Sequence, residues 1–459
     1  MRVVGPQELV EHALTHSTSE QCVVIVHDST SANVRWANNT LTTNGVMRST
    51  DVTVIAFQGV GNASVSGTAW SLEQVSGLVE AADAAARIAA AAEDRADLVE
   101  GTATPEWDEA PAETSIEVFD TFAAQLGESF ARSQSEGRIL YGFVLHDVTT
   151  TYLGSSSGLR LRHVQPSGHY GCTAKDSALT NSAWTGGATR DFSDVDALAM
   201  TDELATRLGW GQRRIDLPAG RYDTVLPPTA VADLMVYAYW TAGGRDAADG
   251  QTVFSRPGGG TRVGETLAAP TVRLHSDPSY PGLESIPFVV ASGSSDRSSV
   301  YDNGLPLGPT DWIREGRLNA LLQTRHTAAV TGLPVTPAVD NLVLEVDGGS
   351  GTTSDLVAGV EDGLLLTCLW YIREVDPQTL LLTGLTRDGV HRIEGGEITG
   401  TVNNFRFNES PVDLLRRHSA ASETELSFSR EWGEDDFSRT ATPALRVPDF
   451  NMSSVSQAL

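Results

Sequence analysis

Residues 381–408 constrain the fold of this chain most strongly, because short apolar runs alternate there with turn residues. Apolar side chains gather at residues 381–385 and return at positions 390–393, 398–402 and 405–407. Glycine-containing turn sequences separate these runs at about the spacing of β-hairpins. The pattern predicts a meander of short antiparallel strands, and by itself it indicates no reaction.

The chain is long enough for two or three domains with cores of their own. It has 459 residues, of which 40% are hydrophobic and 20% are charged, the composition of an ordinary folded protein. Its apolar runs all fall short of a membrane span, and the first residues do not resemble a signal peptide. Cys22, Cys172 and Cys368 are widely scattered and form no CxxC pair. We therefore expect a cytoplasmic protein without a membrane partner.

The charge of the chain excludes one class of partner. It carries 59 acidic and 32 basic side chains, a net charge of −27. A chain this acidic repels the phosphates of nucleic acids, and its basic pairs, 213–214 and 416–417, are too short to form a basic stripe. The composition thus predicts that the protein has no nucleic-acid partner.

The order of apolar patterns and breaks predicts an α+β protein. Two small α/β units, residues 1–100 and 116–215, are joined by an acidic linker with two prolines, residues 101–115. A large, mainly antiparallel β domain with a few helices follows at residues 216–459. Apolar periodicity places the longer helices at about residues 6–18, 71–99, 116–135, 193–208, 229–241 and 309–329.

Three short sequences in the C-terminal part resemble the TldD/PmbA family. They are Thr-Arg-Asp-Gly at 386–389, Ile-Glu-Gly-Gly-Glu-Ile at 393–398 and Val-Asn-Asn-Phe-Arg-Phe at 402–407. The run Arg-Trp-Ala-Asn-Asn at 35–39 is similar to the first domain of the same family, whereas Thr401 stands where a proline is expected. The family was first described as modulators of DNA gyrase and is understood to consist of metallopeptidases.

The resemblance also indicates which branch of the family is closer. Active members carry His-Glu-x-x-x-His on a helix that binds zinc. Alignment on the preceding strand, proline and apolar helix places these roles at Val236, Tyr237 and Thr241. None of the three can be an imidazole ligand or a carboxylate base, and no histidine in the chain is followed directly by glutamate. Residues 431–437, near the place of the family's third ligand, contain no cysteine.

The resemblance is therefore to the PmbA (TldE) branch, which implies a non-catalytic subunit. It implies no catalytic or metal-binding residue and no cofactor in this chain, zinc in a TldD-like partner, and unfolded peptides as the substrate of the heteromeric protease. Candidates for a peptide channel or partner interface are Arg387, Asp388, Asn403, Asn404, Phe405 and Phe407. We expect the C-terminal domain to provide most of the partner contact, with the two phenylalanines at or just beneath it.

Two other functions stay open at this point. The chain is alternatively a stand-alone peptide-binding or scaffold protein without protease activity. A third option is a metal-free hydrolase, because His169 precedes Cys172 by three residues. Side chains three apart on a strand point to opposite faces, which argues against direct contact between them.

Overall fold

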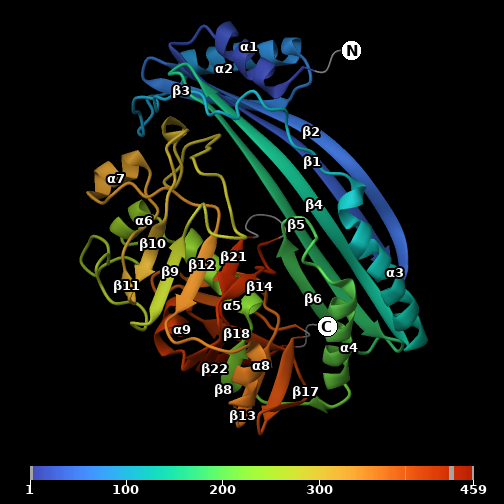
Figure 1. The fold of residues 1–459 in the computed structure, drawn as a ribbon. Coiled ribbons are helices and arrows are strands. Elements are labelled where there is room, and N and C mark those ends of the chain that lie inside the picture. The colour runs from blue at the N-terminus through green and yellow to red at the C-terminus, as the bar shows by residue number, and fades with distance from the viewer. Residues whose placement is uncertain (1–3, 388, 434–438, 457–459) are drawn as a thin grey trace.

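A computed structural model describes residues 4–387, 389–433 and 439–456. The protein is α+β, as predicted, and the described residues form three sheets that are mainly antiparallel (Figure 1). Within these residues, no helix has both the length and the apolar character needed to cross a membrane.

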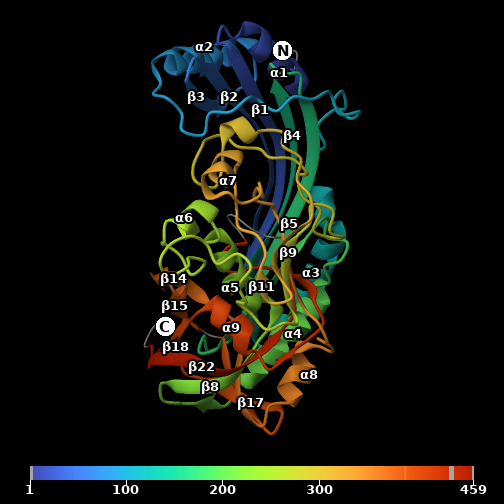
Figure 2. The ribbon, with the colours of Figure 1, turned by 90° about the vertical axis from the view of Figure 1, so that its left-hand side faces the viewer.

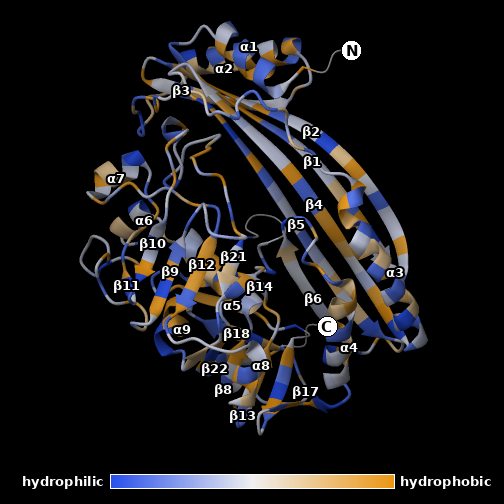
Figure 3. Cartoon of the chain, viewed as in Figure 1, coloured by the Kyte–Doolittle hydropathy of each residue, from blue (hydrophilic) through white to orange (hydrophobic). Residues whose placement is uncertain are grey.

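The N-terminal half is built on one antiparallel sheet of six strands in the order β3-β2-β1-β4-β5-β6. The strands are β1 (Gln21–Ala37), β2 (Thr40–Gln58), β3 (Gly61–Thr68), β4 (Arg138–Ser155), β5 (Arg160–Asp176) and β6 (Ser182–Thr189). Strand β1 pairs with β4 from Val23↔Ser155 to Trp36↔Gly142. The two N-terminal units that were predicted to be separate thus contribute strands to a single sheet. Polar and apolar residues follow one another along its long, curved strands (Figure 3).

Strand β4 is long and continuous. It runs from Arg138 to Ser155, and residues 147–149 in its middle continue the pairing with β1. Strands β1 and β2 meet at a two-residue turn, in which Asn38 and Asn39 have φ of 52° and 56°. Left-handed conformations at both positions are typical of a type I′ hairpin, and asparagine tolerates them well.

Helices cover the sheet at its two ends (Figures 1 and 2). Helices α1 (Pro6–His16) and α2 (Leu72–Ile88) cover one end, and η1 (Ile116–Phe119), α3 (Asp120–Ser135) and α4 (Ala197–Trp210) lie at the other. The predicted helix at 193–208 begins later than expected, because Asp196 caps it by accepting from the amides of Leu198 and Ala199. The predicted linker 101–115 packs on the sheet through Trp107, whose ring meets that of Tyr152 at 5.6 Å.

The C-terminal half contains two more sheets. The first, in the order β11-β10-β9-β12-β21-β20, consists of β9 (Val272–Ser276), β10 (Thr310–Arg314), β11 (Arg317–Leu318), β12 (Leu342–Val346), β20 (Glu425–Ser427) and β21 (Thr440–Thr442). The second has the order β14-β15-β18-β22-β8-β13-β16-β17-β7, with β19 beside β22. Its strands are β7 (Arg214–Ile215), β8 (Gly220–Leu226), β13 (Asp362–Leu366), β14 (Trp370–Asp376), β15 (Leu381–Leu385), β16 (Val390–Glu394), β17 (Glu397–Val402), β18 (Phe405–Glu409), β19 (Ala420–Ala421) and β22 (Leu445–Val455). Three pairings are parallel: β8 with β13, β7 with β17, and β12 with β21.

Residues 381–408 form the four predicted strands but not a simple meander. Strand β15 pairs with β18. Strands β16 and β17 form a hairpin that lies further along the same sheet, where β16 pairs with β13. Alternation of apolar and turn residues fixes strand positions, but it does not determine which strand lies beside which.

The helix predicted at 309–329 is wrong. Residues 310–318 form the hairpin of β10 and β11, and the only helix there is α7 (Arg325–Thr331). Glu315 and Gly316 turn the hairpin with φ of 49° and 72°, and Trp312 is buried in the core. The helix was predicted because the apolar residues of this short hairpin happen to fall at helical spacing.

Helix α5 (Pro228–Trp240) is almost entirely buried, as its apolar sequence predicts. It lies in the largest core cluster, between strands of both C-terminal sheets. The remaining short helices are α6 (Gly244–Ala248), η2 (Val300–Asp302), α8 (Thr353–Ala358) and α9 (Pro411–Arg417). A further cluster, which includes Val23, Phe57, Phe288 and Tyr301, packs the N-terminal sheet against the C-terminal half.

Candidate functional site

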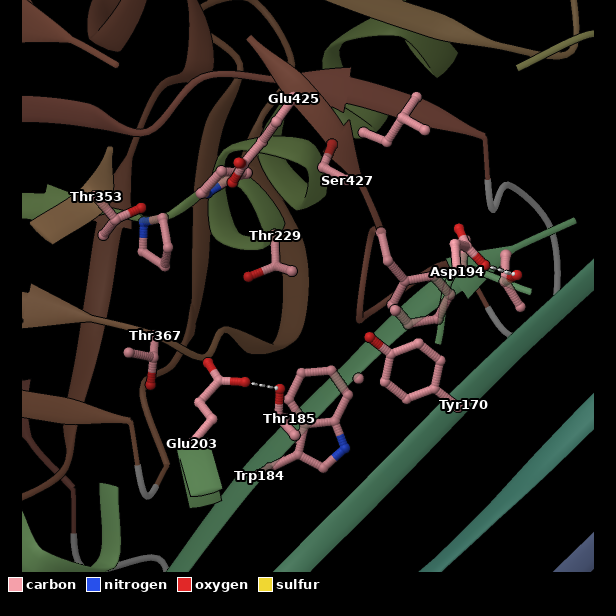
Figure 4. A pocket seen from close by; sticks show the side chains of 18 of the residues that line it. Tyr170, Trp184, Thr185, Asp194, Glu203, Thr229, Thr353, Thr367, Glu425 and Ser427 are labelled. Atoms are coloured by element: carbon pink, nitrogen blue, oxygen red, sulfur yellow. Dashed lines mark hydrogen bonds between the residues drawn. The ribbon is translucent and has the colours of Figure 1, made fainter. Parts of the chain in front are cut away.

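A cavity of about 920 Å³ lies between the N-terminal sheet and the C-terminal half. Strands β5 and β6 and helix α4 form one wall, and the opposite wall contains β20 and the start of α5 (Figure 4). The loop before β17 also belongs to this opposite wall. The cavity is large enough for a segment of peptide.

Two sheet edges flank this cavity. Among the strands that the structure describes, β6 is the last of its sheet and pairs only with β5, and β20 is the last of the first C-terminal sheet. Residues of both strands line the cavity. Amide and carbonyl groups along the outer edge of a terminal strand can pair with an added extended chain. The cavity can therefore hold an extended peptide by its backbone.

Glu203 of α4 is fixed on the wall of the cavity. Its Oε2 accepts from Thr185 Oγ1 at 2.8 Å (Figure 4). Its Oε1 lies 2.5 Å from Arg207 Nη2. Arg207 also donates to the carbonyl of Trp184 on β6. Burial, followed by Glu203 and Asp194, raises the pKa of Tyr170 beside them. The α4 ion pair thus places an acidic group directly against β6.

The charges around the cavity are unbalanced. Its lining has three arginines and five acidic residues, which are Asp194, Glu203, Glu284, Glu397 and Glu425. Arg190 pairs with Glu284 at 3.0 Å, which links the two walls. Burial raises the pKa of Glu425 and lowers that of Arg439. The surplus of acid favours a basic side chain or an amino terminus in the ligand.

The lining contains no histidine or cysteine among the residues that the structure describes. Over the same described residues, no group of three or more histidine, cysteine, aspartate or glutamate side chains could hold a metal ion. The walls provide groups that bind a ligand, mainly backbone, carboxylates and aromatic rings.

The cavity reaches only the first residues of α5, whereas the positions assigned to zinc lie near the other end of this helix. Val236 is fully buried, and the ring of Tyr237 lies 5.7 Å from that of Trp432. Thr241 Oγ1 donates to the carbonyls of Tyr237 and Ala238 at 3.3 and 3.0 Å. Burial raises the pKa of the Tyr237 phenol, which keeps it protonated. These side chains do not fit a zinc ion, because none offers a free ligand atom of the kind zinc prefers.

Residues 428–432 cover this helix and are anchored by Asp233. Ser429 Oγ and the amide of Glu431 donate to Asp233 Oδ1 at 2.8 and 2.9 Å. Trp432 donates its indole N–H to the Asp233 carbonyl at 2.9 Å. Asp233 is fully buried, and burial raises its pKa to about 7. The anchor therefore contains a carboxyl group near its titration point at neutral pH.

The same segment also contacts the N-terminal sheet. The ring of Phe428 stacks on that of His169 at 6.0 Å. The guanidinium of Arg430 lies 4.4 Å from the centre of the Trp184 ring and 3.2 Å from that of Trp370. Residues 428–432 thus join α5 to strands β5 and β6 at the side of the cavity.

Comparison with family models decides the relationship. Residues 219–454 match the model described as the PmbA/TldA metallopeptidase C-terminal domain, and residues 22–89 match PmbA/TldA metallopeptidase domain 1. The chain belongs to the PmbA/TldD metallopeptidase family. A search of curated proteins finds no match.

Solved structures share the fold over nearly the whole PmbA/TldD chain. TldE from Thermococcus kodakarensis has a TM-score of 0.78 at 16% identity and covers 97% of this chain and 99% of its own. A candidate modulator of a DNA gyrase from Thermotoga maritima has a TM-score of 0.73 at 16% identity and covers 94% of this chain and 95% of its own. A candidate modulator of DNA gyrase from Bacteroides thetaiotaomicron has a TM-score of 0.74 at 14% identity and covers 98% of this chain and 98% of its own. Identities this low establish the fold alone.

The residues that the PmbA/TldD resemblance singled out lie away from the cavity. Arg387 lies 5.6 Å from the ring of Trp370, and Phe405 and Phe407 are fully buried in the core. Asn403 is buried and accepts the amide of Leu217 at 2.6 Å. The carbonyl of Asn404 accepts the amide of Ser456, and Asp388 lies outside the described residues. None of the described residues in this set lines the cavity, and the interface assigned to this region stays a prediction.

Cys172 and His169 point away from each other. Cys172 packs in the cluster beneath α3, whereas His169 stacks on Phe428 at the other face of β5. Burial raises the pKa of the Cys172 thiol to about 12, and burial likewise raises that of Cys368 to about 11. Neither thiol is an activated nucleophile near neutral pH.

The cavity residues were missed by the interpretation of the sequence. Glu203 and Arg207 stand four apart on a predicted helix, and residues 184–188 read Trp-Thr-Gly-Gly-Ala. Glycines beside an aromatic residue in a strand are a signal of close backbone approach. No comparable signal in the sequence places β20 opposite β6.

Proposed function

We propose that the chain is the non-catalytic, PmbA (TldE)-like subunit of a two-subunit metalloprotease that processes unfolded peptides. The observation that carries the proposal is the state of helix α5. Val236, Tyr237 and Thr241, to which the resemblance assigns the family's zinc roles, offer no zinc ligand, and Trp432 covers that end of the helix. A TldD-like paralogue would supply the zinc ion and the water that it activates.

The cavity supports a role in holding peptide. Strand addition to β6 or β20 recognises backbone and not sequence, which suits a substrate that is unfolded. The aromatic rings of Tyr170, Trp184 and Phe428 offer apolar contacts along the same wall. In an assembled protease this subunit would bind chain segments, and its partner would cleave them.

The decisive experiment compares this chain alone with a mixture that contains the paralogue. Metal analysis of the isolated chain should find far less than one zinc per chain, and an unfolded peptide should stay intact. Adding the zinc-bearing paralogue should give cleavage, and the two chains should co-purify. Tightly held zinc in the isolated chain, or cleavage by it alone, would contradict the proposal.

A second candidate, a stand-alone peptide-binding protein, is favoured by the position of the cavity within one chain. Peptide binding without the paralogue is expected under both proposals. Failure of this chain to co-purify with any zinc-bearing paralogue, together with peptide binding, would select the second. The metal-free hydrolase lacks support, because the thiol of Cys172 is buried.

A further inference from the structure

Half of strand β2 has no neighbour on one side. Strand β3 pairs with β2 only over Asp51–Gln58. Residues 40–50 pair with β1 on their inner side, and no strand among the described residues pairs with their outer side. A bulge opposite Arg35 and Trp36 interrupts the pairing near Thr42, and the carbonyl of Thr50 accepts the amide of Ala69. Residues 43–49 remain as a regular free edge.

This free edge is exposed and partly apolar. Val46 is 51% exposed and Met47 66% exposed, on opposite faces of the strand. Natural edge strands are usually protected by charges, proline or a covering segment. Here the only charged side chain is Arg48, and Asp28 and Glu113 already pair with it at 3.2 and 2.6 Å. The regular edge is therefore open to pairing with another chain.

The charge of the segment indicates which chain can approach it. Residues 40–50 contain no acidic side chain in a chain of net charge −27. Two copies that meet here avoid opposing their acidic surfaces at the point of contact. A strand that pairs with itself in an antiparallel sense also generates a closed two-fold dimer.

We propose that residues 43–49 pair antiparallel with the same residues of a second copy, with Val46 on the two-fold axis. A two-fold axis perpendicular to the sheet keeps each side chain on its own face, so residue numbers opposite each other sum to an even number. With Val46 at the centre, Met47 lies beside Gly45 of the second copy. An added Cβ at Gly45 would meet nothing within 4 Å, so there is room for the methionine. Arg48 faces Asn44 of the second copy, and no like charges are opposed.

The mass of the protein in solution tests the pairing. Wild-type protein in sedimentation velocity should approach twice 48.9 kDa as its concentration rises. Val46→Glu opposes two carboxylates at the axis and should return the mass to that of one chain. Val375→Glu is a matched control, because Val375 is 54% exposed on β14, the edge strand of another sheet, and should leave the dimer intact. A wild-type chain that remains monomeric, or a dimer lost only in Val375→Glu, would overturn the proposal.

Cysteine substitution tests the register itself. Val46→Cys places two thiols opposite each other at the axis, at a separation that a disulfide can bridge. Mild oxidation should link this variant into a covalent dimer. Asn44→Cys, on the same face, lies four positions from its own copy and should stay unlinked. The native cysteines are buried and should not react. Linking of Asn44→Cys in place of Val46→Cys, or of neither, would overturn the proposed arrangement.

Discussion

The two ends of the N-terminal sheet present the same backbone groups in opposite surroundings. At β6 the free edge faces a cavity, and an added Cβ at Gly186 would lie 2.4 Å from the Trp184 ring and 2.6 Å from the Tyr170 carbonyl. At β2 the free edge faces solvent, and an added Cβ at Gly45 meets nothing. The enclosed edge suits a single extended chain, whereas the open edge suits a flat partner. One sheet can therefore provide two kinds of recognition without any difference in backbone chemistry.

The largest expected effect concerns Asp233, the buried carboxyl group that anchors residues 428–432 at the β6 end of the sheet. Asp233 has its pKa raised from the usual 3.8 to about 7 by burial. The folded state thus holds a proton that the unfolded state loses above pH 3.8. The stabilisation is complete below pH 3.8 and is lost as the pH rises to about 7, with an upper limit of about 4 kcal/mol.

Asp233→Asn should remove this dependence, because an amide oxygen can still accept from Ser429 and Glu431. Urea unfolding at pH 5 and pH 8 should show wild type losing stability relative to the variant as the pH rises. Equal changes in the two proteins would show that Asp233 is ionised in the folded state at both pH values.

Glycine substitution should separate the two edges by stability. Gly186→Val should lower the free energy of unfolding by about 1–3 kcal/mol, because its methyl groups collide with Trp184 and the backbone. Gly45→Val should change it by less than about 0.5 kcal/mol, since valine suits a strand and nothing lies nearby. The same Gly45→Val should weaken self-association by filling the place of Met47. Similar losses of stability at both sites in denaturant unfolding would contradict the contrast.

Peptide binding should depend on the β6 edge and not on the β2 edge. Trp184→Ala removes a ring from the cavity wall and should weaken binding of an unfolded, lysine-containing peptide roughly tenfold, about 1.4 kcal/mol. Trp184→Phe should keep most of the affinity. Val46→Glu should leave it unchanged in fluorescence anisotropy. A stronger effect of Val46→Glu than of Trp184→Ala would place the peptide at the wrong end of the sheet.

The smallest effect is expected for the fold itself at β2. Val46→Glu should alter the free energy of unfolding of the monomeric chain by less than about 0.5 kcal/mol, because its side chain is half exposed. Thermal unfolding at low concentration measures this without the dimer. A loss above about 2 kcal/mol would mean that Val46 is covered within its own chain.

Much of the fold was accessible from the sequence where local pattern decides it. Helix α5 is buried because apolar residues cover all its sides, and the strands of 381–408 lie where apolar runs alternate with turns. The three sequence motifs at 386–389, 393–398 and 402–407 also identified the family. In each case the information lies within a few neighbouring residues.

Arrangements that depend on distant residues were not predicted. Pairing of β1 with β4 joins segments more than a hundred residues apart, and no local pattern records that they meet. The cavity has the same origin, since Glu203 and Glu425 come together only through packing of the two halves. The zinc positions were assigned by resemblance, but the cover that Trp432 provides is a property of the folded chain.

The pairing of β1 with β4 has a consequence for the continuity of the chain. The connection between them passes through residues 101–106, which are mostly exposed to solvent and accessible to a protease. A cut there would leave fourteen paired positions between β1 and β4 to hold the pieces together. The two fragments should therefore elute as one particle and separate only in denaturant. Expressed as separate polypeptides, they form a candidate split protein, whose reassembly would report on formation of the sheet.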